Sequence, residues 1–137
     1  MSNTKEIVRR WLPALLVMLI IFLFSAKPPS ELPNFDAADR FVKKGGHMLG
    51  YALLALSYWR GLGFLPKRKW VAWCLAIVYA VTDEFHQSFV PGRSPSIGDV
   101  LIFDNLGAML SLWIFSPYKT QRSDSPGPIV EKVNVKG

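Results

Sequence analysis

Apolar residues gather in four long stretches along the chain, and short polar connectors separate them. The stretches cover residues 11–24, 47–65, 70–81 and 99–115. A helix needs about 20 mostly apolar residues to cross the roughly 30 Å of hydrocarbon in a bilayer, and each stretch lies near the short end of that range. Several stretches are apolar on all faces, whereas the surface helices of soluble proteins carry an apolar stripe. The pattern therefore predicts an all-α polytopic membrane protein, a bundle of four transmembrane helices with short loops.

The polar segments define the expected domain organisation. Residues 1–10 form a short cytoplasmic N-terminus, and residues 11–115 form the four-helix membrane domain. Residues 116–137 carry Pro, Ser and charges without a clear period, as a flexible cytoplasmic tail does. The first apolar stretch follows a basic segment but lacks a small-x-small cleavage site. We therefore expect it to be retained as a span rather than removed as a signal peptide.

Three connectors carry local signals. Residues 37–42 indicate an amphipathic helical turn ahead of the second span, which is expected to begin near residues 45–47. The third helix is expected to continue past its apolar stretch to about Val90, where a Pro-Gly pair marks a turn. Ser94 or Ser96 is expected to cap the last helix.

The distribution of lysine and arginine predicts the orientation. With the N-terminus inside, nine of them flank the inner ends of the spans: Lys5, Arg9, Arg10, Arg60, Lys67, Arg68, Lys69, Lys119 and Arg122. Five flank the outer ends: Lys27, Arg40, Lys43, Lys44 and Arg93. Because inner loops carry the excess of positive charge, both termini are expected in the cytoplasm. The net charge of +6 then reflects topology and anionic headgroups, so membrane lipids rather than nucleic acid are the expected partners.

Cys74 is the single cysteine and lies inside the third apolar stretch. A disulfide within the chain and a cysteine metal cluster are therefore excluded, and we expect a buried structural thiol. Metal-ligand spacings such as His-x-x-x-His do not occur, so neither a metal site nor another cofactor is expected.

The third apolar stretch runs directly into two carboxylates, Asp83 and Glu84. A charge within the membrane costs about 3 kcal/mol or more unless it is paired or hydrated, so intramembrane acids mark functional-site candidates. A rise of about 1.5 Å per helical residue places Asp83 and His47 each about 20 Å from the inner boundary. The same rise places Asp99 and Asp104 of the last stretch at about 24 and about 17 Å. Three helices are thus predicted to bring ionisable groups to one height in the outer leaflet.

Helical spacing groups these residues further. Gln87 follows Asp83 by four residues and Tyr51 follows His47 by four, so each pair can share a helix face. Two adjacent carboxylates at low dielectric repel each other, so either one holds a proton or cations match both. The available cations are His47, Lys43, Lys44 and Arg93.

A purely structural explanation of this cluster stays open. Polar networks between membrane helices can simply fix their packing. Asp104 can hydrogen-bond a neighbouring helix, and Tyr51 and Gln87 can be packing partners. Gly107 is interpreted as a small-residue contact between helices. His86 falls on a different side of its helix from the carboxylate at position 84 and is expected to be solvated.

Four motif elements occur in a fixed order. They are Phe-Ser-x-x-Pro (24–28), Lys-x-x-His-x-x-x-Tyr (44–51), Asp-Glu-x-x-Gln-x-x-x-Pro-x-Arg (83–93), and Ser-x-x-Asp (96–99) before Leu-Gly-Ala (106–108). In these elements the chain resembles the VanZ-like family of small bacterial integral membrane proteins over about residues 11–115. The resemblance implies a site at the motif positions Lys44, His47, Tyr51, Asp83, Glu84, Gln87, Arg93 and Asp99. It also implies a bacterial plasma membrane and, because the family is named for an accessory determinant of glycopeptide antibiotic resistance, work in the cell envelope.

The last element departs from the family pattern. The family usually has Asn or Asp four residues after the aspartate of Ser-x-x-Asp, but Phe103 stands there, and Asp104 and Asn105 follow. Either a π-bulge absorbs an extra residue, or Asp104 takes the role in a shifted register.

Three functions from different classes fit these residues, and the first is favoured. In it, an outward-facing polar pocket binds an anionic, lipid-linked envelope component, because arginine suits bidentate phosphate contacts. Its ligand-binding residues are Lys44, His47, Tyr51, Gln87, Arg93 and Asp99. In the second, the protein is a membrane-embedded hydrolase or transferase acting on a lipid or peptidoglycan precursor, with Glu84 or Asp83 as base and His47 as acid–base partner. In the third, it is a proton-coupled carrier, which with four spans requires a homo-oligomer.

Overall fold

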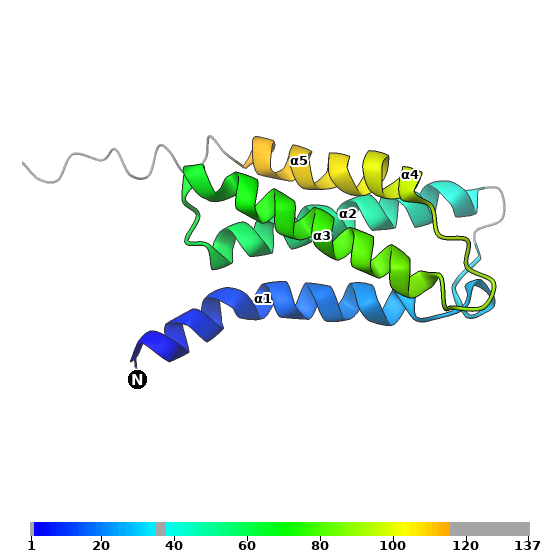
Figure 1. Ribbon diagram of the computed structural model, residues 1–137, viewed down its shortest axis with the longest axis horizontal. Helices are drawn as coiled ribbons and strands as arrows, with labels where there is room; N and C mark the ends of the chain where they lie inside the picture. Colours follow the sequence, from blue (N-terminus) through cyan, green and yellow to red (C-terminus); the bar gives the residue numbers. More distant parts are fainter. Residues whose placement is uncertain (1, 35–37, 116–137) are drawn as a thin grey trace, which may run out of the picture.

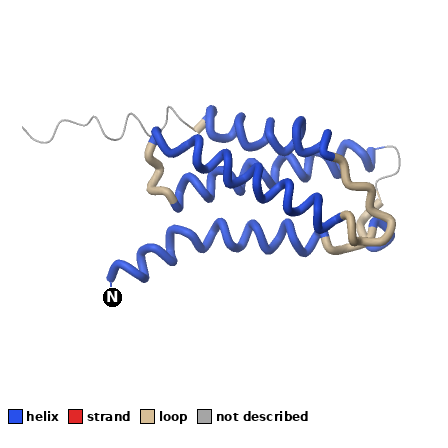
Figure 2. The backbone as a smooth tube through the Cα atoms, viewed as in Figure 1, coloured by secondary structure: helices blue, strands red, loops and turns tan. Residues whose placement is uncertain are grey.

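The structure, a computed structural model, describes residues 2–34 and 38–115 (Figure 1). Its long helices are α1 (Ser2–Ser25), α2 (Asp39–Gly61), α3 (Lys69–Gln87) and α5 (Asn105–Ile114). A short α4 (Ile97–Asp99) and a π-helix, η4 (Val100–Asp104), lead into α5. Two 3₁₀ turns, η1 (Pro29–Glu31) and η3 (Pro66–Arg68), lie in connectors. The described residues form helices and no strands (Figure 2), which confirms the all-α class.

The helices run alternately in opposite directions along the molecule (Figure 1). The N-terminus, the α2–α3 connector and the end of α5 lie at one end, and the α1–α2 and α3–α4 connectors lie at the other. α2 is central because it packs against α1, α3 and α5. It also supplies the largest buried apolar side chains: Tyr51, Leu54 and Trp59. The first half of α2 and the last turns of α3, which carry the motif residues, therefore lie toward the same end.

Gly107 allows α2 and α5 to approach closely. A Cβ atom at this position would collide with the carbonyl oxygen of Met48 in α2 and lie 3.0 Å from the carbonyl carbon. Backbone offers no flexible side chain that could move aside, so only glycine fits. The prediction of a small-residue helix contact at Gly107 is confirmed, and such contacts are typical of membrane helices.

α3 packs through small residues as well. Ala72, Ala76 and Ala80 recur every four residues and are fully buried. Cys74 lies two residues from Ala72 and Ala76, roughly 200° around the helix, and so points away from this face. Its side chain is exposed, and the prediction of a buried thiol is therefore wrong.

Two helix boundaries differ from those expected. α2 already begins at Asp39, so the predicted amphipathic turn and the glycine pair at residues 45–46 belong to one continuous helix. α3 ends at Gln87 rather than near Val90, and hydrogen-bonded turns follow it. Ser96 occupies the N-cap position of α4, as expected, but its side chain makes no capping bond.

α1 carries the strongest membrane signal in the described part of the chain. By length and composition it is the one described helix that could cross a membrane, with a mean hydropathy of 2.1 over its most apolar 18 residues, of which 6% are buried. The apolar stretch Val100–Ile114 is shorter. α2 opens with polar residues and α3 ends with them, which shortens the apolar part of each. Composition thus singles out α1, and the expected four spans are not confirmed by it.

Candidate functional site

Asp83 is the centre of a buried polar cluster that joins three helices. Its Oδ2 accepts hydrogen bonds from Ser25 Oγ of α1 at 2.8 Å, Tyr51 OH of α2 at 3.3 Å and Gln87 Nε2 of α3 at 2.9 Å. The side chain is only 4% exposed. Its other oxygen, Oδ1, is buried and has no hydrogen-bond partner among the described residues. One carboxylate oxygen therefore fastens the end of α1 to both α2 and α3.

Arg93 continues this cluster from the α3–α4 connector. It donates from Nη1 to Gln87 Oε1 at 3.2 Å, from Nη2 to the carbonyl oxygen of Phe24 at 2.7 Å and from Nε to that of Lys27 at 3.2 Å. Phe24 lies in the last turn of α1, where carbonyl groups lack helical partners and a cation is favourable. These bonds use three of the five N–H donors of a guanidinium group, so two remain.

Opposing effects act on the pKa of Arg93. Burial lowers the pKa of Arg93, and the negative charges of Asp83 and Glu84 act in the opposite direction. A guanidinium group stays protonated in proteins, so a fixed positive charge lies at the end of α1.

Glu84 also binds the α3–α4 connector. Its Oε2 accepts the backbone N–H of Ser96 at 2.9 Å. The donor belongs to the N-cap residue of α4, so Glu84 fixes the place where α4 begins. Glu84 and Arg93 thus both fix the connector on the bundle.

His47 lies beside a carboxylate supplied by the last helix. Its Nδ1 is 3.8 Å from Oδ1 of Asp104, whose side chain is 2% exposed. Asp104 closes the π-helix η4, and the next residue, Asn105, accepts a hydrogen bond from Trp73 Nε1 at 2.8 Å. The π-helix provides the extra residue that the sequence pattern required, and Asp104 is the acid that reaches the site. Both explanations left open by the sequence therefore apply, because a π-helix is present and Asp104 lies beside His47.

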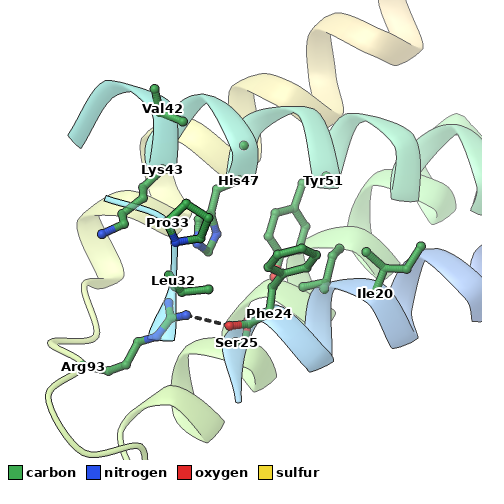
Figure 3. Close-up of a pocket in the computed structure, with 13 residues that line it drawn as sticks. Ile20, Phe24, Ser25, Leu32, Pro33, Val42, Lys43, His47, Tyr51 and Arg93 are labelled. Carbon is green, nitrogen blue, oxygen red and sulfur yellow. Dashed lines mark hydrogen bonds between the residues drawn. The ribbon is translucent and has the colours of Figure 1, made fainter. Parts of the chain in front are cut away.

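A cavity of about 350 Å³ lies between α1, the start of α2 and the α1–α2 connector (Figure 3). Arg93, Lys43 and His47 lie at one side of it, and Ile20 lies toward the other. Ser25 and Tyr51 of the Asp83 cluster also line it. The cavity therefore combines a cationic region with walls that are mostly apolar.

The predicted site residues divide between this cavity and its supports. His47, Tyr51 and Arg93 line the cavity, whereas Asp83, Gln87 and Glu84 hold the elements around it. Lys44 lies over η4, where its Nζ is 4.6 Å from the centre of the Phe103 ring. The side chain of Asp99 lies outside the described part of the structure.

Sequence reasoning missed two features of the site and misplaced one residue. Ser25 and the glycines at 46 and 50 line the cavity, and the four-residue spacing of the glycines on the helix of His47 is the signal that could have found them. His86 was expected to be solvated, but it packs against Phe22 with ring centroids 4.6 Å apart. Its Nε2 is buried and lacks a hydrogen-bond partner among the described residues.

Comparison with models of protein families matches the sequence to a known group. The family model described as VanZ/LLP1 matches residues 10–119, which is most of the chain. The chain belongs to the VanZ/LLP1 family. No curated protein and no solved structure matches it. Membership confirms the resemblance seen in the motifs, and together with α1 it indicates a membrane protein.

The chemistry available to this VanZ/LLP1 protein follows from the geometry. Within the described residues, no three His, Cys, Asp or Glu side chains come together in a group that could hold a metal ion. His47 lies beside Asp104, and Glu84 accepts a hydrogen bond from the backbone N–H of Ser96. The cationic side of the cavity is suited to binding an oxyanion.

Proposed function

We propose that this VanZ/LLP1 protein binds an anionic, lipid-linked component of the bacterial cell envelope in the cavity between α1 and α2. The single observation that carries the proposal is an apolar cavity with Arg93, Lys43 and His47 at one side. Ligand sites are typically apolar cavities of about 300–1,000 Å³ with a few convergent polar groups, and this one fits that description. The link to glycopeptide resistance implied by the family name is part of this proposal.

The proposal includes a membrane arrangement. All four long helices cross the bacterial plasma membrane, with both termini in the cytoplasm and the cavity in the outer leaflet. Large apolar side chains are exposed on every one of these helices, for example Leu19, Leu53, Val78 and Trp113, as lipid-facing surfaces require. The end with the N-terminus also carries the basic connector 67–69, in keeping with the positive-inside rule.

Lys43 and Lys44 provide a matched test of ligand binding. They are neighbours on α2, but Lys43 lines the cavity and Lys44 lies over Phe103. Lys43→Ala is expected to retain at least tenfold less of the bound lipid, because a hydrogen bond to a charged group contributes about 1.5–3 kcal/mol. Native mass spectrometry of protein purified in mild detergent measures the bound species.

The Lys44→Ala variant is the control and is expected to retain the lipid as the wild type does. Equal retention in both lysine variants would contradict the proposal. Loss in Lys44→Ala alone would place the cationic contact on the side of the motif lysine instead.

Glu84→Gln tests the hydrolase or transferase alternative, in which Glu84 is the base. Glutamine still offers an oxygen to the N–H of Ser96, so we expect unchanged lipid retention and thermal stability. Glu84→Ala removes that acceptor and is expected to lower the stability by about 1 kcal/mol. Thermal unfolding in detergent measures both. Turnover of an envelope lipid or peptidoglycan precursor by the wild type that disappears in Glu84→Gln would favour the enzyme.

A further inference from the structure

Two glycines of α2 create the space in which the cavity lies. Gly46 and Gly50 are four residues apart, share a helix face and line the cavity. A Cβ atom at Gly46 would meet nothing within 4 Å, and one at Gly50 would touch only the side chain of Ile21, at 3.6 Å. Side chains are therefore missing from this face of α2 where the backbone itself would allow them.

The opposite wall of the cavity carries exposed apolar side chains. It is formed by α1 residues, of which Ile20 is 54% and Phe24 59% exposed. α1 is also the helix that by composition would face hydrocarbon. The cavity thus has exposed apolar side chains on its α1 wall, in addition to its cationic side. An exposed apolar wall suits a lipid chain better than a soluble anion.

The cationic side indicates which headgroup fits. Arg93 retains two N–H donors after its three bonds to the protein, and Lys43 and His47 lie beside it in the cavity. A terminal phosphate carries about −1.5 to −2 charges at pH 7 and offers three acceptor oxygens. The phosphodiester of a bulk phospholipid has less charge and is substituted on both sides. Three cationic or titratable groups around one cavity match the terminal phosphate better.

Resting on the proposed function, we infer that the ligand is a single-chain membrane lipid ending in a phosphate or pyrophosphate. Its phosphate lies against Arg93, Lys43 and His47, and its chain leaves between α1 and α2 across Gly46 and Gly50 into the bilayer. A space of about 350 Å³ accommodates the headgroup and the first part of one chain, and the rest of the chain stays in the membrane. The glycines thus determine specificity for the chain, and the cations determine specificity for the headgroup.

Gly46 and Gly45 allow a matched experiment. Gly46→Leu fills the chain path, whereas Gly45→Leu places the same side chain on a neighbouring residue that does not line the cavity. Neither position has an atom within 4 Å of the added Cβ, and both substitutions replace a helical glycine by a better helix former. We expect Gly46→Leu to bind farnesyl phosphate at least tenfold more weakly than the wild type and Gly45→Leu to bind it normally. Titrations in detergent followed by native mass spectrometry measure this, and unfolding temperatures verify that both variants fold.

The other outcomes separate this inference from the proposed function. Normal farnesyl phosphate binding by Gly46→Leu would overturn the inference, and the proposed function would stand if Lys43→Ala still loses the ligand. Inorganic phosphate that binds as tightly as farnesyl phosphate would identify a site for a free anion. Dioleoyl phosphatidic acid that competes equally would overturn the single-chain assignment. Failure of every phosphate-bearing probe to bind the wild type would overturn the inference, while retention of another anionic lipid that depends on Lys43 would leave the proposed function standing.

Discussion

Replacement of Asp83 by alanine is expected to unfold the bundle or to detach α1 from it. Ser25, Tyr51 and Gln87 all donate to the same oxygen of Asp83, and Asp83 and Gln87 are each 4% exposed. A buried donor that loses its partner costs about 1–3 kcal/mol, so a combined loss on the order of 3 kcal/mol or more is expected. Unfolding temperature in detergent and recovery of the monodisperse protein from membranes measure this loss.

Asp83→Asn separates the role of the oxygen from that of the charge. The three donors share Oδ2, so one amide oxygen can receive all of them. The amide nitrogen takes the buried position of Oδ1, which has no hydrogen-bond partner among the described residues, so its N–H donors are left unsatisfied. We expect a loss of stability that is smaller than that of Asp83→Ala. A loss as large as that of Asp83→Ala would mean that the charge itself is required, and Asp83 would then belong with the residues that balance Arg93.

The hydrophobic pattern was sufficient to predict the helices and their order. The apolar stretches at 11–24 and 70–81 lie within α1 and α3, because a helix hides its backbone polar groups whatever surrounds it. A fixed rise per residue also placed His47, Asp83 and Asp104 at similar heights, and the short distance between His47 and Asp104 agrees with this. The position of a residue along its helix was therefore sufficient to predict the height of these groups.

The direction of each side chain around its helix could not be read in the same way. The motif singled out Lys44 rather than Lys43 for the site, yet Lys43 lines the cavity and Lys44 lies over the Phe103 ring. Cys74 lies in a stretch that is apolar on every face, so nothing in the sequence marked its side as the exposed one. The sequence alone could not decide whether a π-helix forms before the last helix, because η4 and α5 both pack against α2 and these contacts are not visible in the sequence.

Gly107→Leu is expected to prevent packing of the last helix against α2. Even the Cβ atom would collide with the carbonyl oxygen of Met48, and backbone atoms on both sides leave no room to adjust. Overpacking of a core costs about 1–3 kcal/mol when side chains can shift, and a collision with backbone is expected to cost at least the upper value. The change also displaces Asp104 from His47, so lipid retention should fall together with unfolding temperature.

Gly98→Leu is the matched control, because a Cβ atom there meets only the Ser96 hydroxyl at 3.5 Å. It is expected to fold and to retain lipid as the wild type does. Gly107→Ala should already show most of the defect, since the first added carbon makes the collision. A stable Gly107→Ala protein with full lipid retention would mean that α2 and α5 can move apart without disturbing the cavity. Close packing of α2 against α5 would then not be required for lipid binding.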